Sequence, residues 1–219
     1  GTLDWVTSWD IADVVMIMAQ GTGPDAGTLV CAFLPAGRGP GTFGLTVGEP
    51  LDLLAMGGTH TRPVTLTDVV VPDSDVVLVD REQWLAADAR KTADANPAVF
   101  GIARGAINEL QMLSEQRKDD RMAALASALT ARVVEVRAEA YAAADSDADP
   151  ELRLALRAQA LDLAVQSALA VVTARAGAAM QAGRSTERRM REALFLQVQA
   201  QTASSRAASL DQLIRRHSS

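Results

Sequence analysis

The second half of the chain carries apolar residues at the spacing of amphipathic helices. They recur every three or four positions over residues 97–117, and the same spacing continues over residues 120–145. A third stretch, residues 150–181, is apolar nearly all round in its middle, which is typical of a helix surrounded by other helices. A fourth helix is expected from residue 183 to about residue 216. Four long helices joined by short polar links predict an up-down four-helix bundle over residues 96–219.

Local signals indicate where these helices begin. Pro97 fits a first helical turn because proline has no N–H to leave unpaired. The polar residues 145–150 predict a turn that ends in a helix cap. Ser185 or Thr186 is expected to cap the fourth helix, since a side-chain oxygen can accept a hydrogen bond from the first-turn N–H groups. Glu187 then puts negative charge at the positive end of the helix dipole.

The first 80 residues follow a different pattern, in which short apolar runs of strand length are separated by Gly and Pro. Such runs predict an all-β segment with at least one packed sheet face. The runs are WVTS, VVMIMAQ, TLVCAFLPA, LDLLAM and PVTLTDVVVP, with turns expected at residues 21–24, 37–41 and 57–58 and a strand end at residue 72. The predicted fold class is therefore α+β by domains. A small antiparallel β-barrel or sandwich over residues 1–80 precedes a short linker helix over residues 81–95 and then the bundle.

Composition narrows the class of protein. The chain has 219 residues, 48 % of them hydrophobic and 22 % charged, which is an ordinary balance for a globular protein of one or two domains. Its net charge of −6 would repel phosphates, so we expect no nucleic-acid partner. No run approaches the roughly 20 uninterrupted apolar residues of a membrane span. The basic cluster at the start of the fourth helix is read either as a solvated helix end or as a phosphate contact; it comprises Arg184, Arg188, Arg189 and Arg191.

Few residues offer reactive or metal-binding chemistry. Cys31 is the only cysteine, lies in an apolar run and is expected to be a buried small side chain; a lone cysteine suits a reducing, cytoplasmic compartment. His60 and His217 are far apart in sequence and lack the spacing of a metal site. Gly1 is not a natural start, so we expect a further N-terminal segment that is not in this chain.

Motifs along the whole chain resemble the acyl-CoA dehydrogenase family, whose members are FAD enzymes. Trp5-Val6-Thr7-Ser8 resembles that family's W-I-T-[NS] strand, in which the indole packs beside the flavin ring and the threonine bonds the ring's edge. The segment MGGTHTRPVTLTDVVVP, residues 56–72, resembles the end of the family's β module. The resemblance implies that Trp5, Thr7 and Ser8 contact FAD.

The helical region keeps the family's spacing. GIARGA at residues 101–106 resembles the start of the first long helix, and Arg117 falls at the arginine of the R-x-x-F-G motif. That arginine reaches the FAD pyrophosphate of a neighbouring subunit, so the resemblance also implies an oligomer, either of this chain alone or with related subunits. Here Asp120 and Arg121 replace the motif's Phe and Gly. Gly177 keeps the second glycine of Q-x-x-G-G and is implied as a cofactor contact.

The family's catalytic glutamate is absent. Ala200-Gln201-Thr202 stands where the family has E-G-T, so Thr202 is implied beside FAD, whereas Ala200 has no basic atom. In the family this glutamate removes a proton α to a thioester carbonyl while flavin N5 accepts a hydride from the β carbon. Some members carry the base ten residues before the G-I-A glycine, which is Lys91 here.

Three functions remain open from the sequence. The first is an acyl-CoA dehydrogenase-type oxidoreductase that acts on an acyl-CoA or related substrate with a displaced base. The second is a flavin-dependent oxygenase on the same fold, which does not need the glutamate. The third is a non-catalytic subunit that partners a catalytic acyl-CoA dehydrogenase-like protein.

Overall fold

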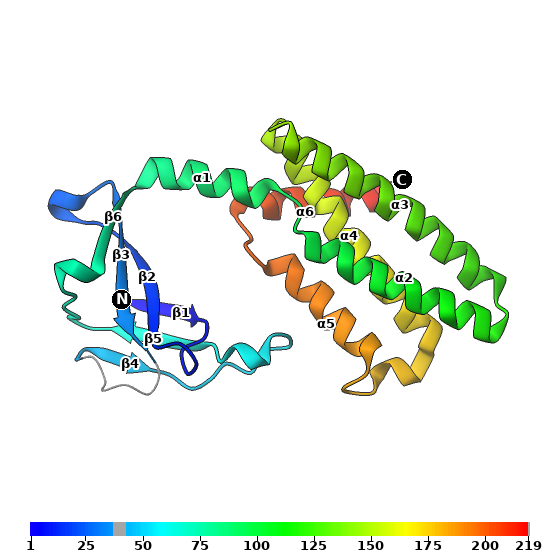
Figure 1. Cartoon of the computed structure of the whole chain (residues 1–219), viewed down its shortest axis with the longest axis horizontal. Coiled ribbons are helices and arrows are strands. Elements are labelled where there is room, and N and C mark those ends of the chain that lie inside the picture. Colours follow the sequence, from blue (N-terminus) through cyan, green and yellow to red (C-terminus); the bar gives the residue numbers. More distant parts are fainter. Residues whose placement is uncertain (37–42, 219) are drawn as a thin grey trace. The chain divides into compact units, whose positions relative to one another are not determined.

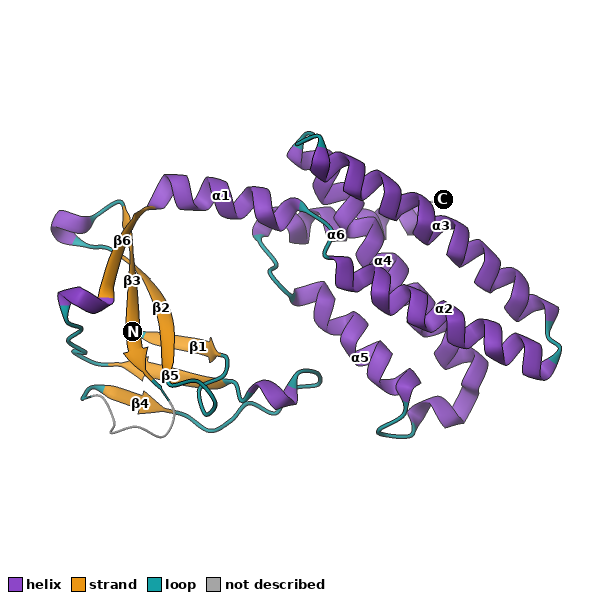
Figure 2. Ribbon diagram, viewed as in Figure 1, coloured by secondary structure: helices purple, strands orange, loops and turns teal. Residues whose placement is uncertain are grey.

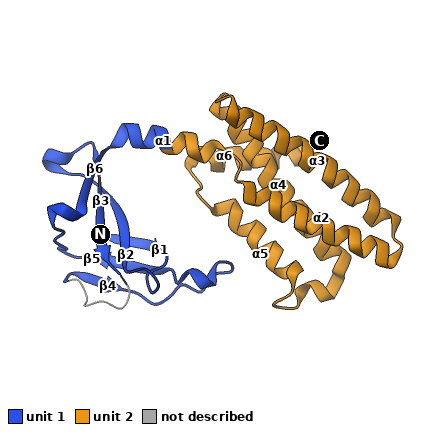
Figure 3. Cartoon of the chain, viewed as in Figure 1, with its two compact units in different colours: residues 1–87 blue, residues 88–219 orange. Residues whose placement is uncertain are grey.

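The computed structural model describes residues 1–36 and 43–218, and the chain divides into two compact units. Gly1–Ala87 holds the strands and Asp88–Ser219 holds most of the helices, as Figure 3 shows. The predicted turn at residues 37–41 lies outside the described residues.

The described part of the first unit contains six strands (Figures 1 and 2). One antiparallel sheet has the order β1-β5-β4 and the other the order β2-β3-β6. The strands are β1 Thr2–Val6, β2 Val14–Gln20, β3 Thr28–Pro35, β4 Leu45–Val47, β5 Arg62–Leu66 and β6 Val76–Asp80, and short 3₁₀ turns lie at η1 Gly23–Asp25, η2 Gly57–Thr59 and η3 Asp73–Asp75. Four of the five apolar runs therefore contain residues of antiparallel strands. Their hydrogen bonds form two separate sheets and do not close them into a barrel, which was one of the two expected forms beside a sandwich.

Both sheets contribute to one small apolar cluster. Val6 and Val64 come from one sheet, Val15 and Leu34 come from the other, and Trp9 joins them from the turn after β1. Two strand predictions were wrong: LDLLAM forms no strand, and residues 69–71 lie beyond the end of β5. Cys31 is buried in β3, as expected.

The helical unit contains more helices than expected. They are α1 Arg81–Ala93, α2 Pro97–Arg117, α3 Asp120–Asp145, α4 Pro150–Arg175, α5 Ser185–Val198 and α6 Ala203–Ser218, with a 3₁₀ turn η4 at Ala176–Met180. The expected fourth helix is therefore two helices, α5 and α6, separated at residues 199–202. The prediction of a simple four-helix bundle was therefore wrong in its last helix. That helix breaks because the backbone is extended at Gln199 and left-handed at Ala200, which has a φ of 48°.

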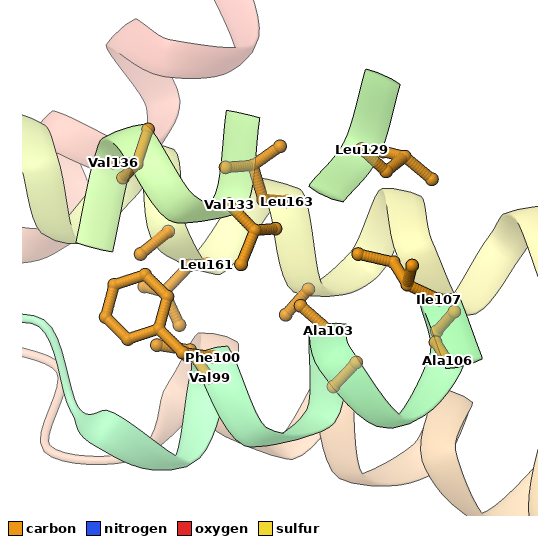
Figure 4. Packing of buried hydrophobic residues seen from close by; sticks show 14 of the residues in the cluster. Val99, Phe100, Ala103, Ala106, Ile107, Leu129, Val133, Val136, Leu161 and Leu163 are labelled. Carbon is orange, nitrogen blue, oxygen red and sulfur yellow. The ribbon is translucent and has the colours of Figure 1, made fainter. Parts of the chain in front are cut away.

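The central element of this unit is α4, which packs against α2, α3, α5 and α6. Thirteen of its residues are buried, which agrees with its apolar middle. Figure 4 shows Val99, Phe100 and Ala103 of α2 beside Val133 of α3 and Leu161 of α4 within the same cluster. By length and composition, Pro150–Met180 is apolar enough to cross a membrane. A helix buried at the centre of a bundle passes the same test.

Two of the predicted helix starts are confirmed. The Asn96 side chain accepts from Ala98 N, with Pro97 in the first turn of α2, and the Asp149 side chain accepts from Glu151 N at the start of α4. The predicted cap of α5 was wrong. Arg184 is the N-cap residue and makes no side-chain cap hydrogen bond. The two hydroxyls expected at that cap donate to a buried carboxylate instead, as described below.

Candidate functional site

A cavity in the helical unit is lined by both positions at which the resemblance places a catalytic base. Lys91 from the end of α1 and Ala200 from the α5–α6 joint both line it, and its volume is about 440 Å³. The remaining lining residues are Thr92, Asp94, Ala95, Asn96, Pro97, Arg157, Leu161, Leu196 and Gln199. We refer to it as the Lys91–Ala200 cavity. Its size is within the range of small-molecule sites in proteins.

Arg157 of α4 connects the walls of this cavity. Its Nη1 donates to the Thr92 carbonyl, while its Nη2 donates to the Gln199 carbonyl over 2.9 Å and to the Ala200 carbonyl over 3.2 Å. Arg157 as a whole is 8 % exposed, and burial lowers its pKa. It lies where the C-terminal ends of α1 and α5 meet. Two helix ends, each with roughly half a negative charge, offset a buried cation that has no carboxylate partner among the described residues.

Neighbouring contacts hold the same region. Asn96 Nδ2 donates to Gln199 Oε1 over 3.2 Å, which connects the start of α2 to the α5–α6 joint. Arg153 Nε and Nη2 each donate to an Asp94 carboxylate oxygen over 2.8 Å, and this pairing raises the pKa of Arg153. Asp94 is therefore engaged in an ion pair at the cavity wall. Ala200 contributes a methyl group and backbone atoms to the cavity, and no proton acceptor on its side chain.

The implied cofactor residues of the first unit are accessible. Trp5 is 66 % exposed on β1, and Thr7 follows it in an exposed turn. Among the described residues, the Thr7 hydroxyl has no hydrogen-bond partner. Ser8 adopts a left-handed φ of 65°, and its N–H donates to the Thr59 carbonyl over 2.8 Å. An exposed indole and an unpartnered hydroxyl fit the flat face and polar rim of a flavin ring.

Two of the three implied cofactor residues of the second unit, Arg117 and Thr202, already have partners within the chain. Arg117 Nη1 donates to the Ala174 carbonyl at the end of α4 over 2.5 Å. Thr202 caps α6, because its hydroxyl accepts from Ser205 N over 3.2 Å and the Ser205 hydroxyl accepts from Thr202 N over 2.8 Å. Gly177 lies in η4, and a Cβ there would meet nothing within 4 Å. The space at Gly177 therefore does not require glycine.

A buried carboxylate near the start of α5 was missed by the sequence analysis. Glu109 of α2 is 3 % exposed and accepts from Thr186 Oγ1 over 2.7 Å and from Ser185 Oγ over 3.2 Å. Arg175 Nε donates to it over 2.5 Å, and Arg189 also pairs with it. A signal was available, because residue 109 falls on the buried face of its helix, three positions after Ala106 and four before Leu113.

Glu109 and the side chains that contact it form the Glu109 cluster, which accounts for part of the basic run at the start of α5. Arg189 is paired with Glu109, and Gly105 leaves room for it, since a Cβ there would lie 3.2 Å from Arg189 Nε. Arg188 pairs with Glu192 over 3.5 Å, and Arg191 pairs with Glu187. Three of the four arginines therefore have carboxylate partners within the helical unit. This pairing favours a structural role for them.

The comparisons with known proteins give a fold. No protein-family model matches the sequence, and no curated protein matches it. Among solved structures, the chain is similar to butyryl-CoA dehydrogenase from Megasphaera elsdenii, with 18 % identity, a TM-score of 0.74, and coverage of 98 % of this chain and 59 % of that one. It is similar to acyl-CoA dehydrogenase from Geobacillus kaustophilus, with 15 % identity, a TM-score of 0.75, and coverage of 97 % and 60 %.

A third similar structure contains reduced flavin. It is a glutaryl-CoA dehydrogenase from Mycobacterium smegmatis in complex with FADH2, with 16 % identity, a TM-score of 0.75, and coverage of 97 % of this chain and 57 % of that one. The chain thus has the fold of the corresponding part of solved acyl-CoA dehydrogenases. It spans about 59 % of the length of two of these structures. At these identities the similarity establishes the fold alone.

Proposed function

We propose that this chain is part of a flavoprotein of the acyl-CoA dehydrogenase type that binds FAD and an acyl thioester. The observation that carries the proposal is the similarity in fold, over 97–98 % of the chain, to several acyl-CoA dehydrogenases. Trp5 and Thr7 support flavin binding, because one leaves an indole face exposed and the other leaves a hydroxyl unpartnered. When bound, FAD would supply the hydride acceptor for oxidation of the acyl chain between its α and β carbons.

The Lys91–Ala200 cavity is the proposed location of proton removal. A dehydrogenase of this type needs a base within hydrogen-bond reach of the substrate's α carbon proton. Ala200 supplies none, and Lys91 lines the same cavity. A lysine acts as a base only in its neutral form, so the reaction is expected to be slow. We therefore propose a slow dehydrogenase, in which Lys91 is the candidate base.

Flavin binding is the first test. The natural protein is purified in full length, and bound flavin is measured by absorbance and identified after denaturation. We expect FAD to copurify at about one per chain. Trp5→Leu is expected to lower the FAD content because the leucine side chain cannot cover the ring. Trp84→Leu on α1 is the matched control and should leave FAD content unchanged. A protein that binds no flavin, alone or with a coexpressed related subunit, would rule out this function.

Reduction of the flavin tests the chemistry. Acyl-CoA is added without oxygen, and loss of oxidised-flavin absorbance is followed over time. The expected result is slow bleaching in the wild-type protein and bleaching about a hundredfold faster in Ala200→Glu, since general-base catalysis contributes on that order. In Ala200→Gln the glutamine side chain has nearly the shape of glutamate but is not basic, so bleaching should stay slow. Lys91→Met should abolish the wild-type rate.

Other outcomes identify the two remaining functions. Flavin that binds only together with a coexpressed related subunit would identify the chain as a non-catalytic partner. Reduced flavin that consumes oxygen and hydroxylates a substrate, with no bleaching by acyl-CoA, would identify an oxygenase.

A further inference from the structure

The helical unit contains a second cavity of comparable size on another pair of helices. It lies between α2 and α3 and has a volume of about 520 Å³. We call it the α2–α3 groove. Its lining residues are Pro97, Phe100, Gly101, Arg104, Ile107, Asn108, Gln111, Thr130, Val133, Val134, Arg137 and Tyr141. The residues from α2 recur at helical spacing, as do those from α3, so one face of each helix borders the groove.

The charge of the α2–α3 groove is unusual for this chain. Arg104 from α2 and Arg137 from α3 line it, and no carboxylate does. Neither arginine has an ion-pair or hydrogen-bond partner within the described part of the chain. Several other arginines of this acidic protein are paired with carboxylates, as Arg132 is with Glu135 on the same helix α3. Two guanidinium groups beside one cavity without an acid between them repel each other unless an anion binds there.

The floor and one end of the groove are apolar and aromatic. Phe100, Ile107 and Val133 are 6 %, 4 % and 8 % exposed, so they form a packed floor. Tyr141 contacts Phe100 edge to face, with ring centroids 5.8 Å apart and an interplanar angle of 88°. That contact fixes the tyrosine ring while leaving the residue 41 % exposed. Gly101 adds no side chain, and a Cβ there would meet nothing within 4 Å, which keeps the end near Phe100 open.

We propose that the α2–α3 groove binds an aromatic phosphate monoester, such as a nucleoside monophosphate. The phosphate would lie between Arg104 and Arg137, because planar guanidinium groups match its oxygens and its near-double negative charge. The aromatic part would lie on the apolar floor beside Tyr141. Asn108 and Gln111 on the rim offer amide donors and acceptors for its polar atoms. This site is separate from the Lys91–Ala200 cavity, and it does not depend on the proposed flavin chemistry.

Two other cavities lined by described residues of the unit do not combine these features. In the Lys91–Ala200 cavity, Asp94 is present and Arg157 is already hydrogen-bonded to three carbonyl groups. A groove between α3 and α4 is lined mainly by apolar side chains, and its Arg216 is paired with Asp162. Two unpaired arginines over an aromatic floor therefore distinguish the α2–α3 groove as an anion site.

The test uses adenosine 5′-monophosphate as the probe, titrated into the 219-residue chain by calorimetry. We expect saturable binding of the monophosphate. Adenosine and inorganic phosphate should each bind about tenfold more weakly, since each lacks one half of the interaction. Arg104→Gln and Arg137→Gln should each weaken binding of the monophosphate about tenfold, which corresponds to one charge-assisted contact. Arg132→Gln, an exposed arginine of α3 outside the groove, is the matched control and should leave the affinity unchanged.

Two further measurements make the result decisive. Tyr141→Leu should weaken binding of the monophosphate but not that of inorganic phosphate. Circular dichroism should show that all these variants keep the helical content of the wild-type chain, since the arginines are exposed. The proposal is overturned if the monophosphate does not bind at millimolar concentration, if adenosine binds equally well, or if the Arg104→Gln, Arg137→Gln double variant binds like the wild type.

Discussion

The guanidinium of Arg157 donates a hydrogen bond to the carbonyl oxygen of Ala200 over 3.2 Å, and the same nitrogen donates to Gln199 over 2.9 Å. These two bonds hold the joint at which the expected fourth helix separates into α5 and α6. A third bond from Arg157 reaches Thr92 at the end of α1. One buried side chain of the central helix thus connects both walls of the Lys91–Ala200 cavity.

Removing the Arg157 guanidinium should destabilise the helical unit. In Arg157→Leu, three carbonyl groups lose their buried donor, and we expect the free energy of unfolding to fall by about 2–4 kcal/mol. Arg157→Lys keeps the positive charge but reaches fewer carbonyls, so its loss should be smaller. Urea denaturation followed by circular dichroism measures both. If Arg157→Leu unfolds at the same urea concentration as the wild type, Arg157 does not connect these elements.

Breaking the Glu109 cluster should be costly as well. Glu109→Leu removes the buried carboxylate that Arg175 and Arg189 share. We expect the free energy of unfolding to fall by about 3 kcal/mol. Thr186→Val removes one hydrogen bond to that carboxylate and should cost about 1 kcal/mol. The control is Glu115→Gln, an exposed position on the same helix, which should change stability by less than about 0.5 kcal/mol. Equal effects of Glu109→Leu and the control would argue against the cluster.

Glycine at position 200 should stabilise the chain. Ala200 has a φ of 48°, a conformation that costs a residue with a Cβ roughly 1–2 kcal/mol. The greater freedom of glycine in the unfolded chain offsets part of that gain, so Ala200→Gly should raise stability by about 0.5–1 kcal/mol. Ala207→Gly, in the exposed interior of α6, should instead lower stability by about 1 kcal/mol. Opposite signs for these two substitutions are the expected result of thermal denaturation.

The β unit should lose stability in acid through Asp10. Arg62 Nε donates to Asp10 Oδ2 over 2.8 Å, and this hydrogen bond holds the pKa of Asp10 below its ordinary value of 3.8. A carboxyl whose folded pKa is depressed stabilises the fold above its unfolded pKa. That contribution is lost as the pH falls from about 3.8 through the lower folded pKa. All three tryptophans lie in this unit and Trp9 is buried, so tryptophan fluorescence reports unfolding of the unit.

Asp10→Asn separates this contribution from general acid denaturation. The variant should be less stable than the wild type at neutral pH, and the difference should vanish below the folded pKa of Asp10. Glu187 gives an independent comparison in the helical unit, because the Arg191 side chain lowers the pKa of Glu187 in the same way. Glu187→Gln should leave the acid transition of Trp9 unchanged. A stability difference for Asp10→Asn that persists at the lowest pH would contradict the assignment.

The sequence alone predicted the features that depend on near neighbours. The starts of α2 and α4 could be read from the sequence because Asn96 and Asp149 cap their helices through N–H groups two residues away. The central place of α4 could be read from its apolar composition, and the strands β2 and β3 from β-branched runs between turn formers. The motif spacing also indicated an acyl-CoA dehydrogenase-like chain, and the similarity in fold agrees with that resemblance.

Only the tertiary structure decided the features that depend on distant partners. Arg157 binds carbonyls that lie 42 and 43 residues away, so no local pattern indicates where the last helix breaks. Ser185 and Thr186 have the composition of a helix cap, yet they donate to Glu109, because folding brings a buried carboxylate within their reach and a charged acceptor forms the stronger hydrogen bond. Local sequence determines which conformations a segment prefers, whereas long-range contacts decide where buried charges find their partners.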